Sequence, residues 1–371
     1  MKTKIASAIL FNAIATSTFA MPSIYGEIDA SIDYLPEHNA IGSNKDVWEL
    51  HSNSSYIGFK GEEKLTDRLS AIYLAEWSIS ADGDGTDWGQ RNRFVGLKDT
   101  QLGVLKVGKH DTPLKQLSGV ADTFNNYAAN SADIQSIMTG ENRLDNAVVY
   151  ESPNLQVPVL DGDIQIKALL ASGESKGINK SSGGVKAAGR GFGDAWSASA
   201  SFSNPFLVAA VAYDKAVPSN FAGHGMLNAS NPHIDGGAIF AAANTIRVVG
   251  QLKPIDGLAL KALFQTSEVE DVVGNDIAAA NIDDSVGWLV GAEYKLPQAQ
   301  QWTVKGQYSQ NSTGFKTAGT DDFDAEQIIA GIDYAVNKQV RTYGYAGYLT
   351  LKQGKEKDKQ PLAGIGLEYK F

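Results

Sequence analysis

The chain has 371 residues, of which 43% are hydrophobic, with 42 acidic and 32 basic side chains and no cysteine. The negative net charge excludes the broad basic face that binds nucleic acid phosphates, and the lack of cysteine excludes a disulfide framework. No stretch approaches the roughly 20 consecutive apolar residues of a membrane-spanning helix. Any membrane role must therefore use strands, because only helices and closed barrels satisfy every backbone group in lipid.

The first twenty residues have the pattern of a secretory signal peptide. Lys2 and Lys4 supply the basic start, residues 5–14 form a mostly apolar run, and small residues lead to a cleavage site of the A-x-A type ending at Ala20. We therefore expect a mature chain over residues 21–371, forming one domain. It keeps 30 basic and 42 acidic residues, a net charge of −12.

Most of the mature chain alternates between apolar and polar residues with the period of a strand. At the start, Ile28, Ile32 and Tyr34 alternate with Glu27 and the acidic and small residues that follow it. At the end, Ile365, Leu367, Tyr369 and Phe371 alternate with Gly364, Gly366, Glu368 and Lys370. The pattern predicts an all-β fold. It does not orient residues 339–352, where Tyr and Gly occupy both faces.

Three further features separate a membrane barrel from a soluble sandwich. The apolar faces end in aromatic residues, which favour a membrane–water interface, and the opposite faces carry Ser, Gly, Gln and charged residues, which suit a wet lumen. The connections alternate between tight turns and long polar stretches, as in outer-membrane barrels. The aromatic residues are Tyr34, Trp77, Tyr150, Trp196, Tyr213, Trp288, Tyr294, Trp302, Tyr308, Tyr334 and Phe371. The long stretches cover residues 36–46, 81–90, 112–142, 174–193, 218–243, 271–283, 312–325 and 353–360.

Counting the segments between these connections gives sixteen antiparallel strands, with both chain ends on the short-turn side. A closed transmembrane barrel of this size leaves an aqueous channel, whereas an eight-stranded barrel is filled by side chains. The predicted strands cover residues 23–35, 47–64, 67–80, 91–99, 103–111, 143–152, 163–173, 194–203, 207–217, 244–253, 257–270, 284–296, 301–311, 326–336, 339–352 and 361–371.

Five short motifs, in this order and spacing, resemble the general porins of Gram-negative bacteria. They are YGEID at 25–29, IGFKGEE at 57–63, RNRFVGLK at 91–98, NRLDNAVVYESP at 142–153 and GLEYKF at 366–371. The resemblance implies a homotrimer of sixteen-stranded outer-membrane barrels, each with its own pore and an inward-folded third loop. It also implies that the terminal Phe371 is an assembly signal.

The third loop of such a barrel would cover residues 112–142, the longest polar stretch of the chain. Within it, Ser131 is positioned to cap a short helical turn that carries Ile134, Ile137 and Met138. We expect these three apolar side chains to hold the loop against the barrel wall.

The site of a porin is a constriction, where basic side chains on one wall oppose acidic side chains on the inward loop. Strand parity predicts that Arg91, Arg93, Arg143, Lys60, Glu27 and Glu76 face the lumen, and the loop offers Asp122, Asp133 and Glu141. The alternative is that these are ordinary wall residues of a wide pore. The sequence departs from the family at Tyr56, where many relatives have arginine, and at Glu27, where some have lysine.

The remaining acidic and histidine residues do not indicate a cofactor, a metal site or a catalytic set. The segment DGDGTD at 82–87 resembles half of a calcium loop, but the twelfth position, which should be glutamate, is Arg93. The five histidines show no ligand spacing, and no nucleophile lies beside a base in a recognisable motif. A solvated acidic loop is the simpler interpretation.

The sequence therefore predicts an outer-membrane porin for passive diffusion of ions and small hydrophilic solutes, in contact with membrane lipid and lipopolysaccharide. A substrate-specific channel with an ordered solute site is the alternative, and a barrel adhesin or barrel enzyme fits less well. Lys180 and Arg190 fall in a stretch expected to be an exposed loop.

Overall fold

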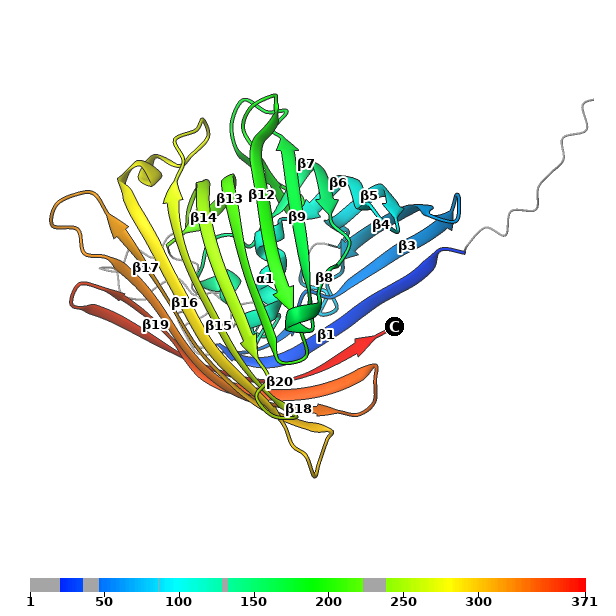
Figure 1. The fold of residues 1–371 in the computed structure, drawn as a ribbon. Coiled ribbons are helices and arrows are strands. Elements are labelled where there is room, and N and C mark those ends of the chain that lie inside the picture. Colours follow the sequence, from blue (N-terminus) through cyan, green and yellow to red (C-terminus); the bar gives the residue numbers. More distant parts are fainter. Residues whose placement is uncertain (1–20, 36–46, 86, 129–132, 223–237) are drawn as a thin grey trace, which may run out of the picture.

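The computed structural model describes residues 21–35, 47–85, 87–128, 133–222 and 238–371, and antiparallel strands make up nearly all of its regular structure (Figure 1). The expected signal peptide at residues 1–20 and the expected cap Ser131 lie outside these ranges. None of the helices in the described ranges has the length and apolar character needed to span a membrane.

Sixteen consecutive wall strands pair with their neighbours into one barrel, in which β2 and β3 together count as one wall strand because both pair with β1. The wall strands are β1 (Ser23–Leu35), β2 (Val47–Ser52) with β3 (Tyr56–Lys64), β4 (Leu69–Ser78), β5 (Gly89–Asp99), β6 (Gly103–Asp111), β7 (Arg143–Glu151), β9 (Gly162–Ser172), β12 (Phe192–Ser203), β13 (Leu207–Phe221), β14 (Ile239–Leu252), β15 (Leu258–Val269), β16 (Ile282–Lys295), β17 (Trp302–Phe315), β18 (Phe323–Ala335), β19 (Val340–Gln353) and β20 (Glu356–Lys370).

The barrel closes where the first and last strands meet (Figure 1). Strand β1 pairs with β20 in an antiparallel register that runs from Glu27 opposite Lys370 to Tyr34 opposite Ala363. The terminal residue extends this pairing, since Phe371 exchanges two backbone hydrogen bonds of 3.1 Å with Gly26. Closure pairs the two strands that would otherwise present open edges, which a wall in lipid requires.

The inside of this barrel is polar and the outside is apolar, as the alternation predicts. On β1, Glu27, Asp29 and Asp33 are buried inside, whereas Ile24 and Ile32 are exposed on the outer face. The same exposure of large apolar side chains recurs on almost every wall strand. An outer apolar band of this kind faces the hydrocarbon of a membrane.

Pairs of aromatic rings lie on the outer face across neighbouring strands. Trp302 and Tyr334 have ring centroids 4.6 Å apart, and Trp196 and Tyr213 have centroids 5.2 Å apart. Trp302 is 39% exposed. These amphipathic rings suit the headgroup level, where their polar ends meet water.

Strand β19, which the sequence does not orient, points Tyr343 and Tyr345 inward and Tyr348 outward. Glycines on β20 make this arrangement sterically accessible. A Cβ added to Gly366 would lie 2.2 Å from the Tyr343 ring, and one added to Gly364 would lie 2.6 Å from the Tyr345 hydroxyl. The large inward rings therefore occupy the space that the missing side chains leave, as cross-strand partners do.

Several of the predicted connections are shorter in the structure, two of them clearly so. Residues 353–360 are mostly strand, because β19 and β20 are joined through Gly354 (φ +58°) and Lys355. The charge-rich segment that opens β20 still alternates, with Asp358 and Gln360 buried inside. Residues 218–221 and 239–243 likewise extend β13 and β14.

The connections also contain short elements that complete the fold. They are α1 (Pro113–Ala121) and the 3₁₀ turns η2 (Ile134–Ser136), η3 (Pro158–Leu160) and η4 (Ile277–Asn281), together with β8 (Leu155–Val157), β10 (Asn179–Ser181) and β11 (Gly184–Lys186). The sequence prediction contained neither α1 nor the β10–β11 hairpin.

Candidate channel constriction

Residues 112–128 and 133–142 lie inside the barrel and form the inward segment, which begins with the helix α1 (Figure 1). The Thr112 hydroxyl accepts a hydrogen bond of 3.1 Å from the Lys115 backbone amide, and Pro113 follows it in the first turn. Both are favoured helix-start residues. The helix packs against β9 and β12–β16, so it lies along the wall on the far side of the lumen from β3–β5.

Arg247 of β14 holds both ends of this segment to the wall. Its guanidinium donates to the Glu141 carboxylate at 2.5 Å, to the Ser118 hydroxyl at 2.6 Å and to the Thr139 carbonyl at 2.9 Å. Gln265 of β15 accepts two further hydrogen bonds from Arg247. The Arg247 side chain is fully buried, and such a charge needs a partner and a complete set of hydrogen bonds to be tolerated.

Tyr127 anchors the middle of the segment to the strands near the barrel closure. Its hydroxyl donates to Asp333 at 2.7 Å and accepts from Lys305 at 2.5 Å. Its ring centroid lies 4.3 Å from that of Tyr343 and 5.4 Å from that of Tyr345. The inward tyrosines of β19 thus serve as the surface on which this part of the segment packs.

The apolar side chains of η2 and of the two residues that follow it provide a third attachment. Ile134, Ile137 and Met138 are each no more than 4% exposed and belong to one buried cluster with Leu114 and Leu289. Their packing against the wall is the arrangement that the sequence predicts for them. The residue at the start of the turn is Asp133, which makes no side-chain cap hydrogen bond there.

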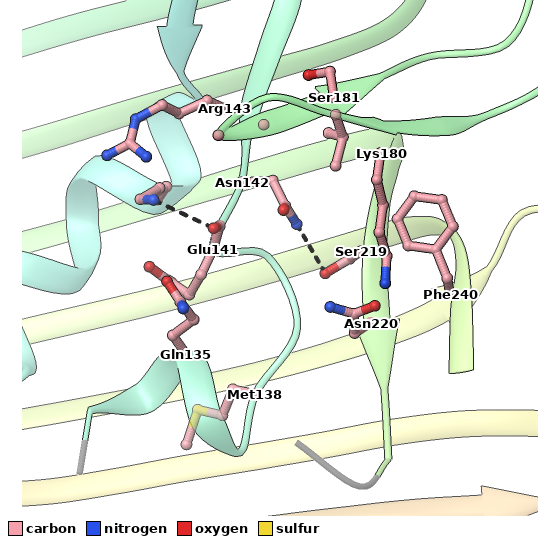
Figure 2. Close-up of a pocket in the computed structure, with 14 residues that line it drawn as sticks. Gln135, Met138, Glu141, Asn142, Arg143, Lys180, Ser181, Ser219, Asn220 and Phe240 are labelled. Atoms are coloured by element: carbon pink, nitrogen blue, oxygen red, sulfur yellow. Dashed lines mark hydrogen bonds between the residues drawn. The ribbon is translucent and has the colours of Figure 1, made fainter. Parts of the chain in front are cut away.

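Two hollows meet at one group of side chains in this part of the lumen. One hollow has a volume of about 240 Å³ and the other about 360 Å³, and the larger is drawn in Figure 2. Their linings share Lys115, Gln135, Glu141 and Arg143. We call these four residues the waist. Lys115 and Gln135 are additions to the site that the sequence prediction did not contain.

Basic side chains line the smaller hollow on the side of β5 and β7. Arg91 lies over the Tyr56 ring at 4.6 Å, and Arg143 is paired with Asp111 at 3.0 Å. Asp111 also lies 3.4 Å from Lys115. The residue at 56 is therefore a stacking surface for Arg91, a geometry that favours a guanidinium.

Arg93 does not face the lumen, which corrects the prediction from strand parity. A β-bulge opposite Glu76 places both Arg91 and Asn92 between the paired positions Gln90 and Arg93. The extra residue changes the alternation. Arg93 therefore shares the face of Val95 (63% exposed) and stacks on the outer-face ring of Trp77 at 5.0 Å.

Acidic side chains from residues 112–142 line the same hollow from the opposite side. Asp122 accepts hydrogen bonds from the amides of Phe124 and Ile134, which fixes the path of the chain. Burial raises the pKa of Asp122 to about 6. Burial and then the nearby Asp122 and Glu141 charges raise the pKa of Asp133 well above its ordinary value. The negative side of the hollow is thus sensitive to pH.

The remaining predicted residues lie on the lumen wall outside the two hollows. Glu27 is 3.6 Å from Lys370 and lies opposite Tyr56 in the β1–β3 pairing. The Lys60 ammonium lies 4.4 Å from the centre of the Tyr25 ring, and Glu76 is buried. Neither hollow is lined by Glu27, Lys60 or Glu76.

The β10–β11 hairpin also enters the barrel, although the sequence suggested an exposed loop. Val185 pairs with Leu144 of β7 in parallel fashion, and Ile178 and Val185 are both 4% exposed. Lys180 consequently lines the larger hollow, with its side chain next to the Phe240 ring (Figure 2). Arg190 is exposed, as expected.

The acidic segment that resembles half of a calcium loop uses its carboxylates internally. Asp82 accepts hydrogen bonds from the Ser52 amide, the Ser80 hydroxyl and the Asp84 amide. Asp87 accepts one from the Ser80 amide. These contacts are those of a self-stabilised polar loop.

Comparison with known proteins identifies the family. Residues 6–354 match the sequence profile described as Gram-negative porin. The chain belongs to the Gram-negative porin family. The barrel and this membership place it in the bacterial outer membrane as a channel protein.

Individual relatives agree with this assignment. The chain is 30% identical over 132 residues to major outer membrane protein P.IB of Neisseria sicca, a match covering 34% of this chain and 37% of the relative. It is 23% identical over 373 residues to the protein of that name from Neisseria meningitidis serogroup B, covering 98% of both chains.

Solved structures share the fold at low sequence identity. An anion-selective porin from Comamonas acidovorans superposes with a TM-score of 0.69 at 17% identity, covering 95% of this chain and 100% of that one. The trimer form of OmpT from Vibrio cholerae superposes with a TM-score of 0.64 at 15% identity, covering 95% and 100% of the two chains.

Proposed function

We propose that ions and small hydrophilic solutes cross this porin by passive diffusion past the waist, where they are sorted by size and charge. One observation supports this most directly. The hollow of about 240 Å³ is lined by the basic residues Arg91, Lys115 and Arg143 and by the acidic residues Asp111, Asp122, Asp133 and Glu141. Opposite charges across a narrow aqueous passage produce a transverse field that orders water and solutes.

The wall and the inward segment give this field a fixed geometry. Arg91 is held over Tyr56, and Arg143 is held by Asp111. The opposite side is attached through Arg247 and Tyr127. Charges held in place next to a passing ion act over a few ångströms, where salt screens them less than it does at an open surface.

We also propose that the protein functions as a homotrimer in contact with lipopolysaccharide, through its outer apolar face and acidic loops. The family resemblance and the trimer form described for the Vibrio cholerae OmpT structure support the oligomer. No catalytic role is proposed, because the charged groups of the waist form ion pairs that hold the inward segment and the wall in place. A signal peptide at residues 1–20 and an assembly role for Phe371 belong to the same proposal.

Single-channel recording of purified protein in planar bilayers tests the function. The proposal expects stable ohmic steps that occur in groups of three, and a folded species that survives sodium dodecyl sulfate until heating. Protein that inserts without conducting would contradict it. A monomer in unheated samples and in cross-linking would contradict the trimer alone.

A substrate-specific channel remains the second candidate. The larger hollow favours it, because that hollow combines charged and apolar lining residues (Figure 2). Competition between solutes separates the two functions. A general porin shows flux proportional to concentration, whereas a specific channel saturates.

A further inference from the structure

We propose that the β10–β11 hairpin builds a binding subsite for small organic carboxylates with a short apolar body, on the extracellular side of the waist. Lys180 would hold the carboxylate and Phe240 the apolar body, in the hollow of about 360 Å³ drawn in Figure 2. This subsite deepens the proposed diffusion function and rests on it.

The hairpin is fixed to the wall and is not a free loop. Its tip is attached by Lys109 of β6, whose ammonium donates to the Ser182 carbonyl at 2.5 Å and to the Ser181 hydroxyl at 3.2 Å. Gly183 has φ +62°, and a Cβ there would lie 1.9 Å from the Gln90 carbonyl oxygen. Only glycine fits this close approach of two backbones in the left-handed region.

The base of the hairpin is attached as firmly as its tip. The Ile178 amide donates to the Val273 carbonyl at 2.9 Å. Ile178, Val185 and Ala187 are all buried in one apolar cluster with Leu144 and other inward residues. The backbone that carries Lys180 lies between these two attachments, so less backbone freedom is lost on binding a ligand.

Lys180 is the available cation at this level. Its ammonium lies 5.2 Å from the centre of the Phe240 ring, and within the described part of the chain it has no hydrogen bond or ion pair. Lys109 and Lys115, by contrast, are paired with Asp145 and Asp111. A lysine ammonium has three donors, so Lys180 can donate to an incoming carboxylate without giving up a partner.

The rest of the hollow sets the class of ligand. Arg143 and Lys115 lie on its inner side, so an anion meets three basic groups against the single Glu141, whose carboxylate is already held by Arg247. Phe240, Met138 and Val185 add apolar surface. Among the described residues, the buried amide oxygen of Asn220 lacks a hydrogen-bond partner and can accept one from a ligand. Apolar surface with a few convergent polar groups is typical of small-molecule sites.

The arrangement also fits the path of a solute that enters from the extracellular side. The larger hollow shares the waist with the smaller one, so a carboxylate released by Lys180 meets Arg143 next and then Arg91. A series of weak anion sites of this kind raises local solute concentration while still allowing release.

Current block by benzoate tests the subsite in the full-length porin. Benzoate is expected to reduce the current of the parent in a saturable manner, while benzyl alcohol, which has a similar body without the charge, has little effect. Lys180→Gln should weaken the apparent affinity for benzoate about fivefold, the effect of losing one charge contact in water. Lys176→Gln, an exposed lysine of the same loop, is the matched control and should behave as the parent.

Phe240→Leu provides the second variant. It should weaken block by benzoate but leave any block by inorganic phosphate unchanged, because phosphate has no apolar body. Equal block of the parent and Lys180→Gln would overturn the proposal, as would block by benzyl alcohol at benzoate concentrations. If the parent protein did not conduct ions in potassium chloride, that result would instead contradict the diffusion function. In that case, calorimetric titration of benzoate into the folded parent and into Lys180→Gln would still show whether benzoate binds at the subsite.

Discussion

The two walls on either side of residues 112–128 and 133–142 use their basic residues differently. On the β13–β18 side, Arg247 and Lys305 lie on regular strands and are covered by the inward segment, and each is paired with a carboxylate. On the β5–β7 side, Arg91 and Arg143 lie next to bulges and line open hollows. The comparison teaches that the local regularity of the strand determines the role of an arginine. On a regular, covered strand its charge stabilises the fold, and next to a bulge its charge faces the solutes.

Removing the charge of the covered wall should have the largest effect. Arg247→Met leaves Glu141 buried without its partner, a loss of about 3–5 kcal/mol for a buried pair. The temperature at which the folded protein unfolds in sodium dodecyl sulfate should fall. Open-channel noise should rise, because residues 118, 139 and 141 lose their shared attachment to Arg247.

The control for that variant is Lys352→Met, which breaks a more exposed pair with Glu326. Pairs with this exposure contribute little, so its heat stability and noise should remain close to those of the parent. Equal behaviour of the two variants would mean that Arg247 does not hold the inward segment.

Removing charge from the open wall should change selectivity more than stability. The double variant Arg91→Ser, Arg143→Ser should shift the reversal potential in a salt gradient toward cation selectivity. One charge ~4 Å from a passing ion in water should change the cation-to-anion permeability ratio about fivefold. Arg93→Ser is the matched control, since Arg93 stacks on the outer-face Trp77. A shift from Arg93→Ser as large as that from the double variant would contradict the assignment of faces.

A smaller effect is expected from pH. Because burial raises the pKa of Asp122 to about 6, lowering the pH from 7.5 to 5 adds a proton and removes a negative charge from the waist side. Anion preference should therefore increase over this window. Asp122→Asn keeps only one of the two carboxylate oxygens that accept the Phe124 and Ile134 amides, and it should reduce this pH dependence because it has no acidic proton. An unchanged pH profile would show that Asp122 does not face the permeating ions.

The strands and their closure could be predicted from the sequence because alternation with period two directly encodes the two faces of a wall. The prediction failed where one extra residue changes that alternation, as at Arg91 and Asn92 opposite Glu76. A bulge has no sequence signal of its own in a single chain. The helix α1 did leave a signal in Thr112 and Pro113, but a nine-residue helix is short beside the polar stretch that contains it.

The partners of Lys180 and Glu141 could not be read from the sequence for a different reason. Each meets residues about 60 to 110 positions away, Phe240 and Arg247, through the folding of connections into the lumen. Such contacts depend on the path of a loop and not on a local pattern. The inward tyrosines of β19 belong to the same class, because their direction is set by Gly364 and Gly366 on the next strand.

The central claim is that permeating ions pass the waist, and cysteine accessibility tests it most directly. The parent chain contains no cysteine, so a single introduced thiol gives an unambiguous signal. Gln135→Cys places a thiol between the two hollows, and reaction with a bulky, charged methanethiosulfonate should reduce single-channel conductance severalfold. Arg93→Cys, on the outer face, should leave it unchanged. Modification of Gln135→Cys without any change in conductance would contradict the account.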